Sequence, residues 1–252
     1  MPILRATERD RVTIVKTRDA TCKIGLAKGE QGEGIERFLR GYGFQANLTK
    51  RPLDFCQKFG DIELIPLPST DVTREVAKGN LSFGVTGLDL VLATSITFST
   101  PKIQIIKQID IAPVDLVLFS KDGKLDPKPK NPTIVVPWYY CSFLTRANPV
   151  LVYVNDTWGN PKIKKTNGST ECYVKNNWAE MGFDATTWFT KKTDEERGKT
   201  TLAKNGLAPL KRFLRSDSVV ITKCGDVADW QKFERVLGCA GKLSSGPING
   251  DR

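Results

Sequence analysis

The sequence predicts an α/β fold of two lobes with a ligand cleft between them. Short runs rich in β-branched residues alternate with helical patterns along most of the chain, as in proteins built on a largely parallel sheet. The 252 residues are enough for one large domain or two smaller lobes. A Lys- and Pro-rich segment at 121–132 interrupts the pattern near its middle, and we interpret it as the crossover between the lobes.

The first lobe is predicted to contain three strands, each followed by a helix. Asp71 is expected to cap the second helix, and Gly79 to end it, because glycine tolerates the left-handed conformation found after helix C-termini. In chain order we expect a strand at 22–26, a helix through Ile35 and Leu39, a strand at 61–65, a helix from 71 to 77, a strand at 81–85 and a helix after Asp89.

The second lobe is predicted from a looser alternation of patterns. We expect strands at 103–109, 114–119, 133–136 and 150–154, helices at about 172–181 and 201–214, a last strand at 218–222 and a closing helix at 227–237. The last strand returns the chain to the first lobe. We therefore expect one lobe formed by residues 1–104 with 217–252, and a second formed by 105–216.

Composition limits the chemistry that the chain can perform. It contains no histidine, which excludes Ser-His-Asp and Cys-His catalysis and a histidine general base. Carboxylates, lysines, hydroxyls and backbone amides remain, together with Mg²⁺ bound largely through substrate phosphates. The six cysteines form no C-x-x-C pair, which argues against a zinc ribbon.

The net charge of +10 favours an anionic ligand such as a phosphorylated small molecule. The basic residues are accompanied by no nucleic-acid-binding motif, so we do not expect nucleic acid as the partner. Apolar runs are too short to span a bilayer, and the first residues lack the apolar stretch of a secretory signal. We expect a cytoplasmic protein without a membrane partner, and leave targeting to an organelle open.

A candidate phosphate-binding segment lies at 197–207, which reads R-G-K-T-T-L-A-K-N-G-L. Free backbone N–H groups at a helix start, together with threonine hydroxyls, can hold a phosphate group. Gly198 would allow close approach, and Lys199 would add positive charge. A threonine-capped helix without a ligand fits the same residues. A nucleoside-triphosphatase P-loop does not, because Thr193 stands where that pattern needs glycine.

Four segments in order carry a resemblance to a known family. They are K-I-G-L-A-K-G-E at 23–30, D-I-E-L-I-P-L-P-S-T-D-V at 61–72 continuing into K-G-N-L-S-F-G-V-T-G-L-D-L at 78–90, N-G-S-T-E at 167–171, and T-L-A-K-N-G-L at 201–207 followed by R-S-D-S-V-V-I at 215–221. Together they resemble the ATP phosphoribosyltransferases, the first enzymes of histidine biosynthesis. The likeness extends over about residues 22–222.

The resemblance implies a two-lobed, periplasmic-binding-protein-like architecture. It also implies a glycosyltransferase that joins ATP and phosphoribosyl pyrophosphate, giving N1-(5-phosphoribosyl)-ATP and pyrophosphate, with Mg²⁺ on the pyrophosphate. The chain resembles the short form of the family, which implies a homo-oligomer and a separate regulatory subunit.

The resemblance further implies residue roles. The 5′-phosphate would be held by Gly198, Lys199, Thr200 and Thr201. The nucleotide side of the cleft would be lined by Lys28, Gly29, Thr86, Gly87 and Asp89. Candidate catalytic acids are Asp194, Glu195 and Glu171, the first two for ribose hydroxyls or the metal. Each role has a structural alternative. Glu171 fits a favourable acid in a first helical turn, Asp89 a helix cap, and Lys28 a solvated turn residue. Residues 194–197 fit an exposed charged loop.

The chain also departs from the family pattern in the phosphate loop. Here the loop reads D-E-E-R-G-K-T-T-L at 194–202. Without a gap, Gly198 falls on the family's Ser/Thr position and Lys199 on its glycine, whereas a one-residue insertion restores Gly198 to the glycine position. This departure leaves a second hypothesis open, a non-catalytic two-lobed binding or sensor protein for a phosphorylated small molecule. A basic nucleic-acid-associated protein is a third hypothesis, which rests on charge alone.

Overall fold

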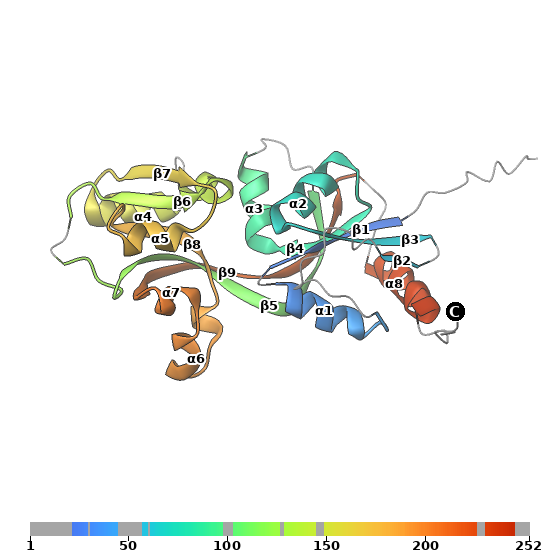
Figure 1. The fold of residues 1–252 in the computed structure, drawn as a ribbon. Helices are drawn as coiled ribbons and strands as arrows, with labels where there is room; N and C mark the ends of the chain where they lie inside the picture. The colour runs from blue at the N-terminus through green and yellow to red at the C-terminus, as the bar shows by residue number, and fades with distance from the viewer. Residues whose placement is uncertain are drawn as a thin grey trace, which may run out of the picture.

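The protein, described here by a computed structural model, is built on one mixed sheet of nine strands (Figure 1). The structure describes residues 22–29, 31–44, 57–59, 61–97, 103–126, 129–144, 149–225 and 230–244. The strand order is β2-β3-β1-β4-β9-β5-β8-β6-β7. Helices pack on both faces of this sheet, so the α/β fold class predicted from the sequence is confirmed.

One half of the molecule contains the parallel strands that carry the first two motifs. Its elements are β1 (Cys22–Ala27), α1 (Gly32–Arg40), β2 (Gln57–Phe59), β3 (Ile62–Leu67), α2 (Ser69–Lys78), β4 (Phe83–Gly87), α3 (Leu88–Thr97) and, at the end of the chain, α8 (Trp230–Ser244). Strand β1 lies between β3 and β4, parallel to both. Helices α1 and α8 share one apolar cluster with β1, whereas α2 and α3 share another with the far end of β9.

The other half repeats this arrangement with shorter elements. They are β6 (Thr133–Pro137), the 3-10 helix η1 (Trp138–Leu144), α4 (Pro149–Trp158), β7 (Lys162–Thr166), α5 (Thr170–Lys175), β8 (Met181–Thr186), the 3-10 helix η2 (Trp188–Thr190), α6 (Asp194–Gly198) and α7 (Thr201–Lys204). Strand β6 runs parallel to both β7 and β8. Every helix among the described residues is too short or too polar to cross a membrane.

Two long antiparallel strands, β5 (Ile103–Lys121) and β9 (Leu207–Lys223), run from one half into the other. Successive side chains of β5 point alternately to the two faces of the sheet. Leu116 and Leu118 enter the cluster beneath η1 and α4, whereas Val117 and Phe119 enter the cluster beneath α5 and α7. The register shifts between Ile109 and Val114, so the two ends of β5 pair with different parts of β9.

Most of the predicted first half is confirmed, with one correction at α2. Pro68 is the residue before the helix, so Asp71 lies in the first turn and pairs with Arg74 at 2.9 Å instead of capping. Gly79 ends the helix with a φ of 83°, as predicted. The expected start of the closing helix at 227 lies outside the described residues, and α8 is described from Trp230.

Four predictions for the second half are wrong. The strands expected at 103–109 and 114–119 are one bulged strand, because both segments pair with β9. The strand expected at 150–154 is helix α4, which buries Val150 and Val154 on one face. The helix expected at 172–181 ends at Lys175, and Met181 begins β8. The helix expected at 201–214 ends at Lys204, because Gly206 has a φ of 67° and the chain then pairs with β5.

Candidate functional site

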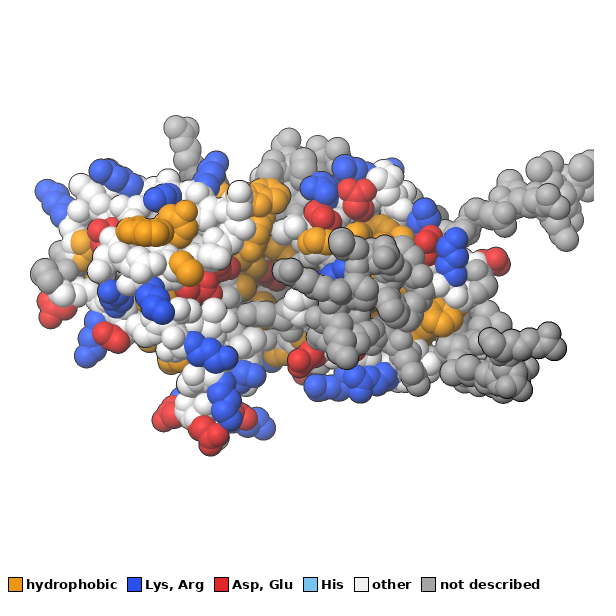
Figure 2. All heavy atoms as spheres, in the orientation of Figure 1, with side chains coloured by type: hydrophobic (Ala, Val, Ile, Leu, Met, Phe, Trp, Pro, Cys, Tyr) orange, Lys and Arg blue, Asp and Glu red, His pale blue; other side chains and the backbone are white. Residues whose placement is uncertain are grey.

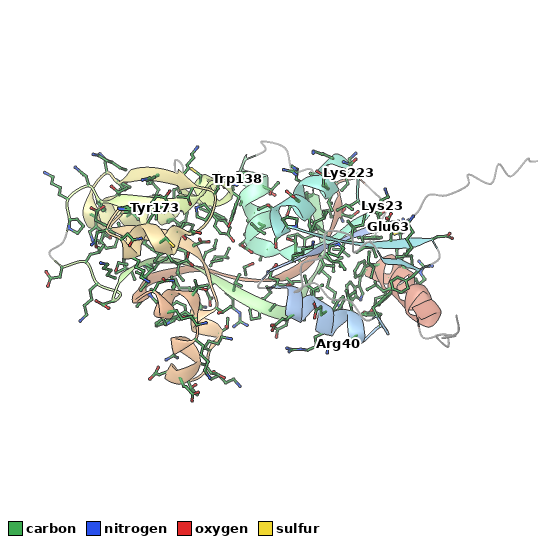
Figure 3. All side chains as sticks on the ribbon, in the orientation of Figure 1. Lys23, Arg40, Glu63, Trp138, Tyr173 and Lys223 are labelled. Atoms are coloured by element: carbon green, nitrogen blue, oxygen red, sulfur yellow. The ribbon has the colours of Figure 1, made fainter. Side chains whose placement is uncertain are left out.

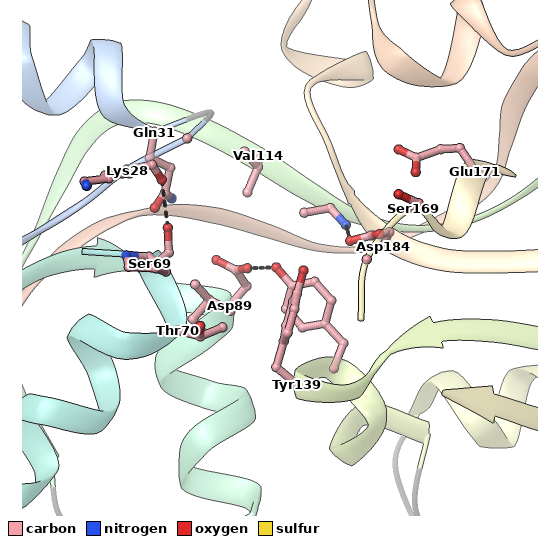
Figure 4. A pocket seen from close by; sticks show the side chains of 16 residues that line it. Lys28, Gln31, Ser69, Thr70, Asp89, Val114, Tyr139, Ser169, Glu171 and Asp184 are labelled. Carbon is pink, nitrogen blue, oxygen red and sulfur yellow. Dashed lines mark hydrogen bonds between the residues drawn. The ribbon is translucent and has the colours of Figure 1, made fainter. Parts of the chain in front are cut away.

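A cavity of about 570 Å³ lies between the two halves (Figure 4). The parallel strands β1, β3, β4, β6 and β7 all point their carboxyl ends toward it, and the residues just after those ends contribute most of its wall. Ligands of open α/β sheets bind at such edges. It is lined by Lys28, Gly29, Gln31, Pro68, Ser69, Thr70, Asp89 and Leu90 from one half, by Tyr139, Tyr140, Gly168, Ser169, Glu171, Asp184 and Ala185 from the other, and by Val114 of β5.

Asp89 is the buried acid of this cavity, with only 2% of its surface exposed. Its Oδ1 accepts a hydrogen bond from Ser216 Oγ at 2.5 Å, and its Oδ2 accepts one from the phenol of Tyr140 (Figure 4). The backbone N–H of Asp89 also donates to Ser216 Oγ at 2.9 Å. Burial raises the pKa of Asp89, and the two hydroxyl donors oppose that rise. The carboxyl group therefore links α3 to β9 and η1.

Gly87 allows this arrangement, because a side chain there would collide with two cavity residues. A Cβ on Gly87 would lie 2.2 Å from Asp89 Oδ1 and 2.8 Å from Gln31 Nε2. Gln31 itself is 6% exposed, and its Oε1 has no hydrogen-bond partner among the described residues. A buried acceptor of this kind at a cavity wall is available to a ligand.

The other residues predicted to line the nucleotide side of the cleft lie at the carboxyl ends of β1 and β4. The backbone carbonyl of Lys28 accepts a hydrogen bond from Ser69 Oγ at 3.1 Å, and Lys28 lines the cavity. Thr86 is fully buried, and its hydroxyl donates to the Ser69 carbonyl at 3.2 Å. Lys28, Gly29 and Asp89 line the cavity, whereas Thr86 and Gly87 lie behind its wall and contact the lining residues.

The opposite wall carries two acids, Glu171 and Asp184. The hydroxyl of Thr170 lies 2.5 Å from Asp184 Oδ2 and 3.4 Å from Glu171 Oε2. The backbone N–H of Ala185 donates to Asp184 Oδ1 at 2.8 Å. Figure 4 shows both acids across the cavity from Lys28 and Gln31.

A second cavity of about 340 Å³ adjoins the first, since Gly29 lines both. It contains three of the residues predicted to hold phosphate. Its wall consists of Gly29, Glu33, Thr187, Lys191, Glu196, Lys199, Thr200 and Thr201. The buried Thr200 caps α7: its hydroxyl donates to the Arg197 carbonyl at 2.7 Å and accepts from the backbone N–H of Ala203 at 3.4 Å.

The acids predicted at 194 and 195 lie on the short helix α6, outside the walls of both cavities. A capping box between Thr193 and Glu196 starts this helix. Asp194 pairs with Arg197 at 2.6 Å and Glu195 with Lys199 at 2.9 Å, and both acids are largely exposed. Gly198 ends α6, and a Cβ added to it would have no heavy atom within 4 Å.

Sequence reasoning missed four residues that form this site. Gln31, Tyr140, Asp184 and Lys191 lie in or beside the cavities, yet none belongs to a segment that carried the resemblance. Tyr140 could have been suspected from the run of aromatic residues W-Y-Y at 138–140 after an expected strand. Nothing local distinguishes Asp184 from other acids of the chain.

Comparison with known protein families shows to which family the chain belongs. The sequence model of the family described as ATP phosphoribosyltransferase matches residues 68–238, more than half of the chain. The chain belongs to this family. The matched range includes most of the residues that line both cavities. No curated protein matches the sequence closely enough to be counted as a relative.

Solved structures agree on the fold. An ATP phosphoribosyl transferase (HisG:HisZ) complex from Thermotoga maritima contains a chain with a TM-score of 0.58 and 16% identity, covering 88% of this chain and 98% of that one. Protein AF1704 from Archaeoglobus fulgidus has a TM-score of 0.50 and 12% identity, covering 88% of this chain and 75% of that one. At these identities the likeness shows the fold, which is the two-lobed periplasmic-binding-protein-like architecture predicted from the sequence.

Proposed function

We propose that this member of the ATP phosphoribosyltransferase family joins ATP to phosphoribosyl pyrophosphate. The products would be N1-(5-phosphoribosyl)-ATP and pyrophosphate, in the first step of histidine biosynthesis. The observation that carries the proposal is the pair of cavities that meet at Gly29. A reaction between two phosphorylated substrates needs two adjoining sites, and family membership favours ATP and phosphoribosyl pyrophosphate as those substrates.

In this proposal the smaller cavity holds the 5′-phosphate of the ribosyl donor. Lys191 and Lys199 supply charge there, and Thr201 supplies a hydroxyl. Gly198 and Thr200 shape the loop, the first by leaving space and the second by capping α7. The larger cavity takes the nucleotide, with Lys28, Gly29, Thr86, Gly87 and Asp89 on its floor and wall.

The chemistry requires no nucleophilic side chain. Adenine N1 attacks the anomeric carbon and forms a C–N bond, while the C–O bond to pyrophosphate breaks and pyrophosphate leaves with the electron pair. Positive charge develops on the ribose in the transition state, and Glu171 and Asp184 carry carboxylates that would stabilise it from across the cavity. We propose Asp194 and Glu195 as acids that approach the ribose hydroxyls only if the loop moves on binding.

Magnesium would enter with the substrate. Among the described residues no three Cys, Asp or Glu side chains form a group that could hold a metal ion, so its ligands would come mainly from the pyrophosphate oxygens. A Mg²⁺ ion held there would supply charge neutralisation for the leaving group. The protein's own part is to orient the two substrates and to keep Lys28 and Lys199 near their phosphates.

The proposal extends to assembly and location. We propose a cytoplasmic homo-oligomer that works with a separate regulatory subunit, since the related Thermotoga maritima structure is of a HisG:HisZ complex. We also propose two lobes close to the expected division, with boundaries at the register shift of β5 between Ile109 and Val114 and near Ser216 of β9.

The test is to incubate the protein with ATP, phosphoribosyl pyrophosphate and Mg²⁺, adding pyrophosphatase to remove pyrophosphate. Formation of the adduct, identified by mass, is expected from the wild type. Asp184→Asn should lower kcat, whereas Asp156→Asn, an exposed residue of α4, should not. Absence of adduct in every condition, with the regulatory subunit supplied, would overturn the enzymatic proposal.

One observation favours the alternative of a binding or sensor protein. The acids at 194 and 195 are engaged in ion pairs outside the walls of both cavities, and the loop departs from the family pattern. Saturable binding of ATP or phosphoribosyl pyrophosphate without turnover would support this alternative.

A further inference from the structure

A third, apolar groove opens beside the nucleotide cavity. It encloses about 330 Å³ between helices α2 and α3 of one half and η1 of the other. Figure 2 shows hydrophobic side chains in the furrow between the two halves. Three residues, Thr70, Leu90 and Tyr139, line both the groove and the larger cavity, so the two spaces adjoin.

Trp138 forms the outer wall of this groove and is 54% exposed. Its ring meets Tyr139 edge to face, with centroids 5.7 Å apart and planes at 84°. In Figure 3 Trp138 lies at the edge of its half that faces α3. A large aromatic side chain left half-exposed at the mouth of a ligand cavity can stack on a planar ring.

The polar groups of the groove suit a heteroaromatic ring better than a phosphate. Among the described residues that line the groove, Arg74 is the one cation, and it is already paired with Asp71 at 2.9 Å and with Glu75 at 3.3 Å. The hydroxyls of Thr70 and Thr94 make no hydrogen bond to another described residue. Each can donate to or accept from a ring nitrogen.

We propose that the groove is the subsite for the purine base of the nucleotide, with Trp138 as the stacking residue. The inference rests on the proposed function for the identity of the nucleotide. The base would be held at the seam between the halves, with its N1 edge facing the larger cavity, where the proposed reaction needs the ribose of the donor. A base bound there contacts α3 and η1 together, so it favours the arrangement in which the two halves enclose the cavity.

The test measures ATP and inorganic tripolyphosphate binding by calorimetry and tryptophan fluorescence. Trp138→Ala should raise the Kd for ATP roughly 5- to 100-fold, the range expected for loss of one stacked base, and leave tripolyphosphate binding unchanged. Trp138→Phe should keep most of the affinity and lose the fluorescence change. The matched control is Trp178→Ala: Trp178 is 62% exposed but contacts Tyr173, away from the groove.

The outcomes separate this inference from the proposed function. If the wild type forms the adduct and Trp138→Ala has an unchanged KM for ATP, the base subsite is wrong and the reaction stands. If no adduct forms but ATP binding depends on Trp138, the reaction is wrong and the subsite stands. If Trp138→Ala keeps its ATP affinity but associates more weakly with a second copy or a regulatory subunit, the groove binds a protein partner. That outcome overturns the inference.

Discussion

The phenol of Tyr140 donates a hydrogen bond to Oδ2 of Asp89, and both residues are buried. Asp89 lies in the first turn of α3 in one half, and Tyr140 lies in η1 of the other, 51 positions further along the chain. The contact therefore joins the two halves at the wall of the cavity. Any change at either residue is expected to affect stability and ligand binding together.

Replacing Tyr140 by phenylalanine removes one donor from the buried carboxylate. We expect Tyr140→Phe to lower the free energy of unfolding by about 1–3 kcal/mol, the usual cost of leaving a buried acceptor unpaired. Urea unfolding measures this. Tyr153→Phe is the control, since the Tyr153 ring packs on Trp158 and its hydroxyl bonds to no described residue. Equal stabilities of the two variants would contradict the role assigned to the Tyr140 hydroxyl.

The raised pKa of Asp89 predicts a pH-dependent stability. Because burial raises this pKa, the folded state binds the proton more readily than the unfolded chain. The cost of ionising Asp89 is therefore complete above the folded pKa and disappears as the pH falls toward the ordinary value of 3.8. Relative to Asp89→Asn, the wild type should gain stability from neutral pH down to about pH 4.

The measurement is chemical unfolding of both proteins across that range. Asp156→Asn serves as the control, because Asp156 is exposed and should give a constant difference from the wild type. A constant difference for Asp89→Asn as well would mean that burial does not perturb this carboxyl.

Gly87→Ala tests the close packing around Asp89 and Gln31. The added Cβ would lie 2.2 Å from Asp89 Oδ1, so the carboxyl group or β4 must move. We expect a loss of about 1–3 kcal/mol in stability and weaker ATP binding. Gly198→Ala, where a Cβ meets nothing within 4 Å, should keep wild-type stability. Thermal unfolding and calorimetry of the pair measure both effects, and a Gly87→Ala variant as stable as Gly198→Ala would refute the packing argument.

Thr200 and Thr201 are adjacent in the predicted phosphate loop but are expected to behave differently. The Thr200 hydroxyl already caps α7, so Thr200→Ala should lower stability by about 1 kcal/mol. The exposed Thr201 faces the smaller cavity, so Thr201→Ala should weaken binding of phosphoribosyl pyrophosphate without a change in stability. Unfolding and binding assays on both variants separate the cap from the ligand contact; the reverse pattern would exchange their roles.

The first half of the fold could be predicted from the sequence because its signals are local. Strand β1, helix α1 and the glycine at the end of α2 follow from short apolar runs and turn residues. The segment 207–214 was predicted wrongly, because its apolar residues fit helical spacing while its backbone pairs with β5, 86 to 98 positions earlier. Strand pairing over that separation overrides local preference.

The sequence predicted site residues only in the segments that resemble the family. Lys28, Gly29 and Asp89 were expected on one side of the cleft, and they line the larger cavity. The partners of Asp89 could not be foreseen, since Ser216 lies 127 positions away and Tyr140 comes from the other half. The helical form of 194–198 was also not foreseen, although Thr193 and Glu196 have the spacing of a capping box.

Lys199 gives the most direct test of the phosphate pocket. Its ammonium lies 2.9 Å from Glu195 Oε1, an exposed pair that contributes little to stability, and Lys199 also lines the smaller cavity. A bound phosphate would compete with Glu195 for this charge. Lys199→Met should therefore raise the Kd for phosphoribosyl pyrophosphate about 10-fold, a value typical of one lost charge-assisted hydrogen bond, and leave ATP binding unchanged.

Lys204→Met is the matched control, because Lys204 is exposed on α7 and lies outside the wall of that cavity. Both variants remove one positive charge, so a general loss of electrostatic attraction would weaken donor binding equally in the two. A larger effect at Lys199 that persists at high salt would indicate direct contact with the phosphate, since screening removes the long-range part first. Equal effects would mean that the phosphate binds elsewhere.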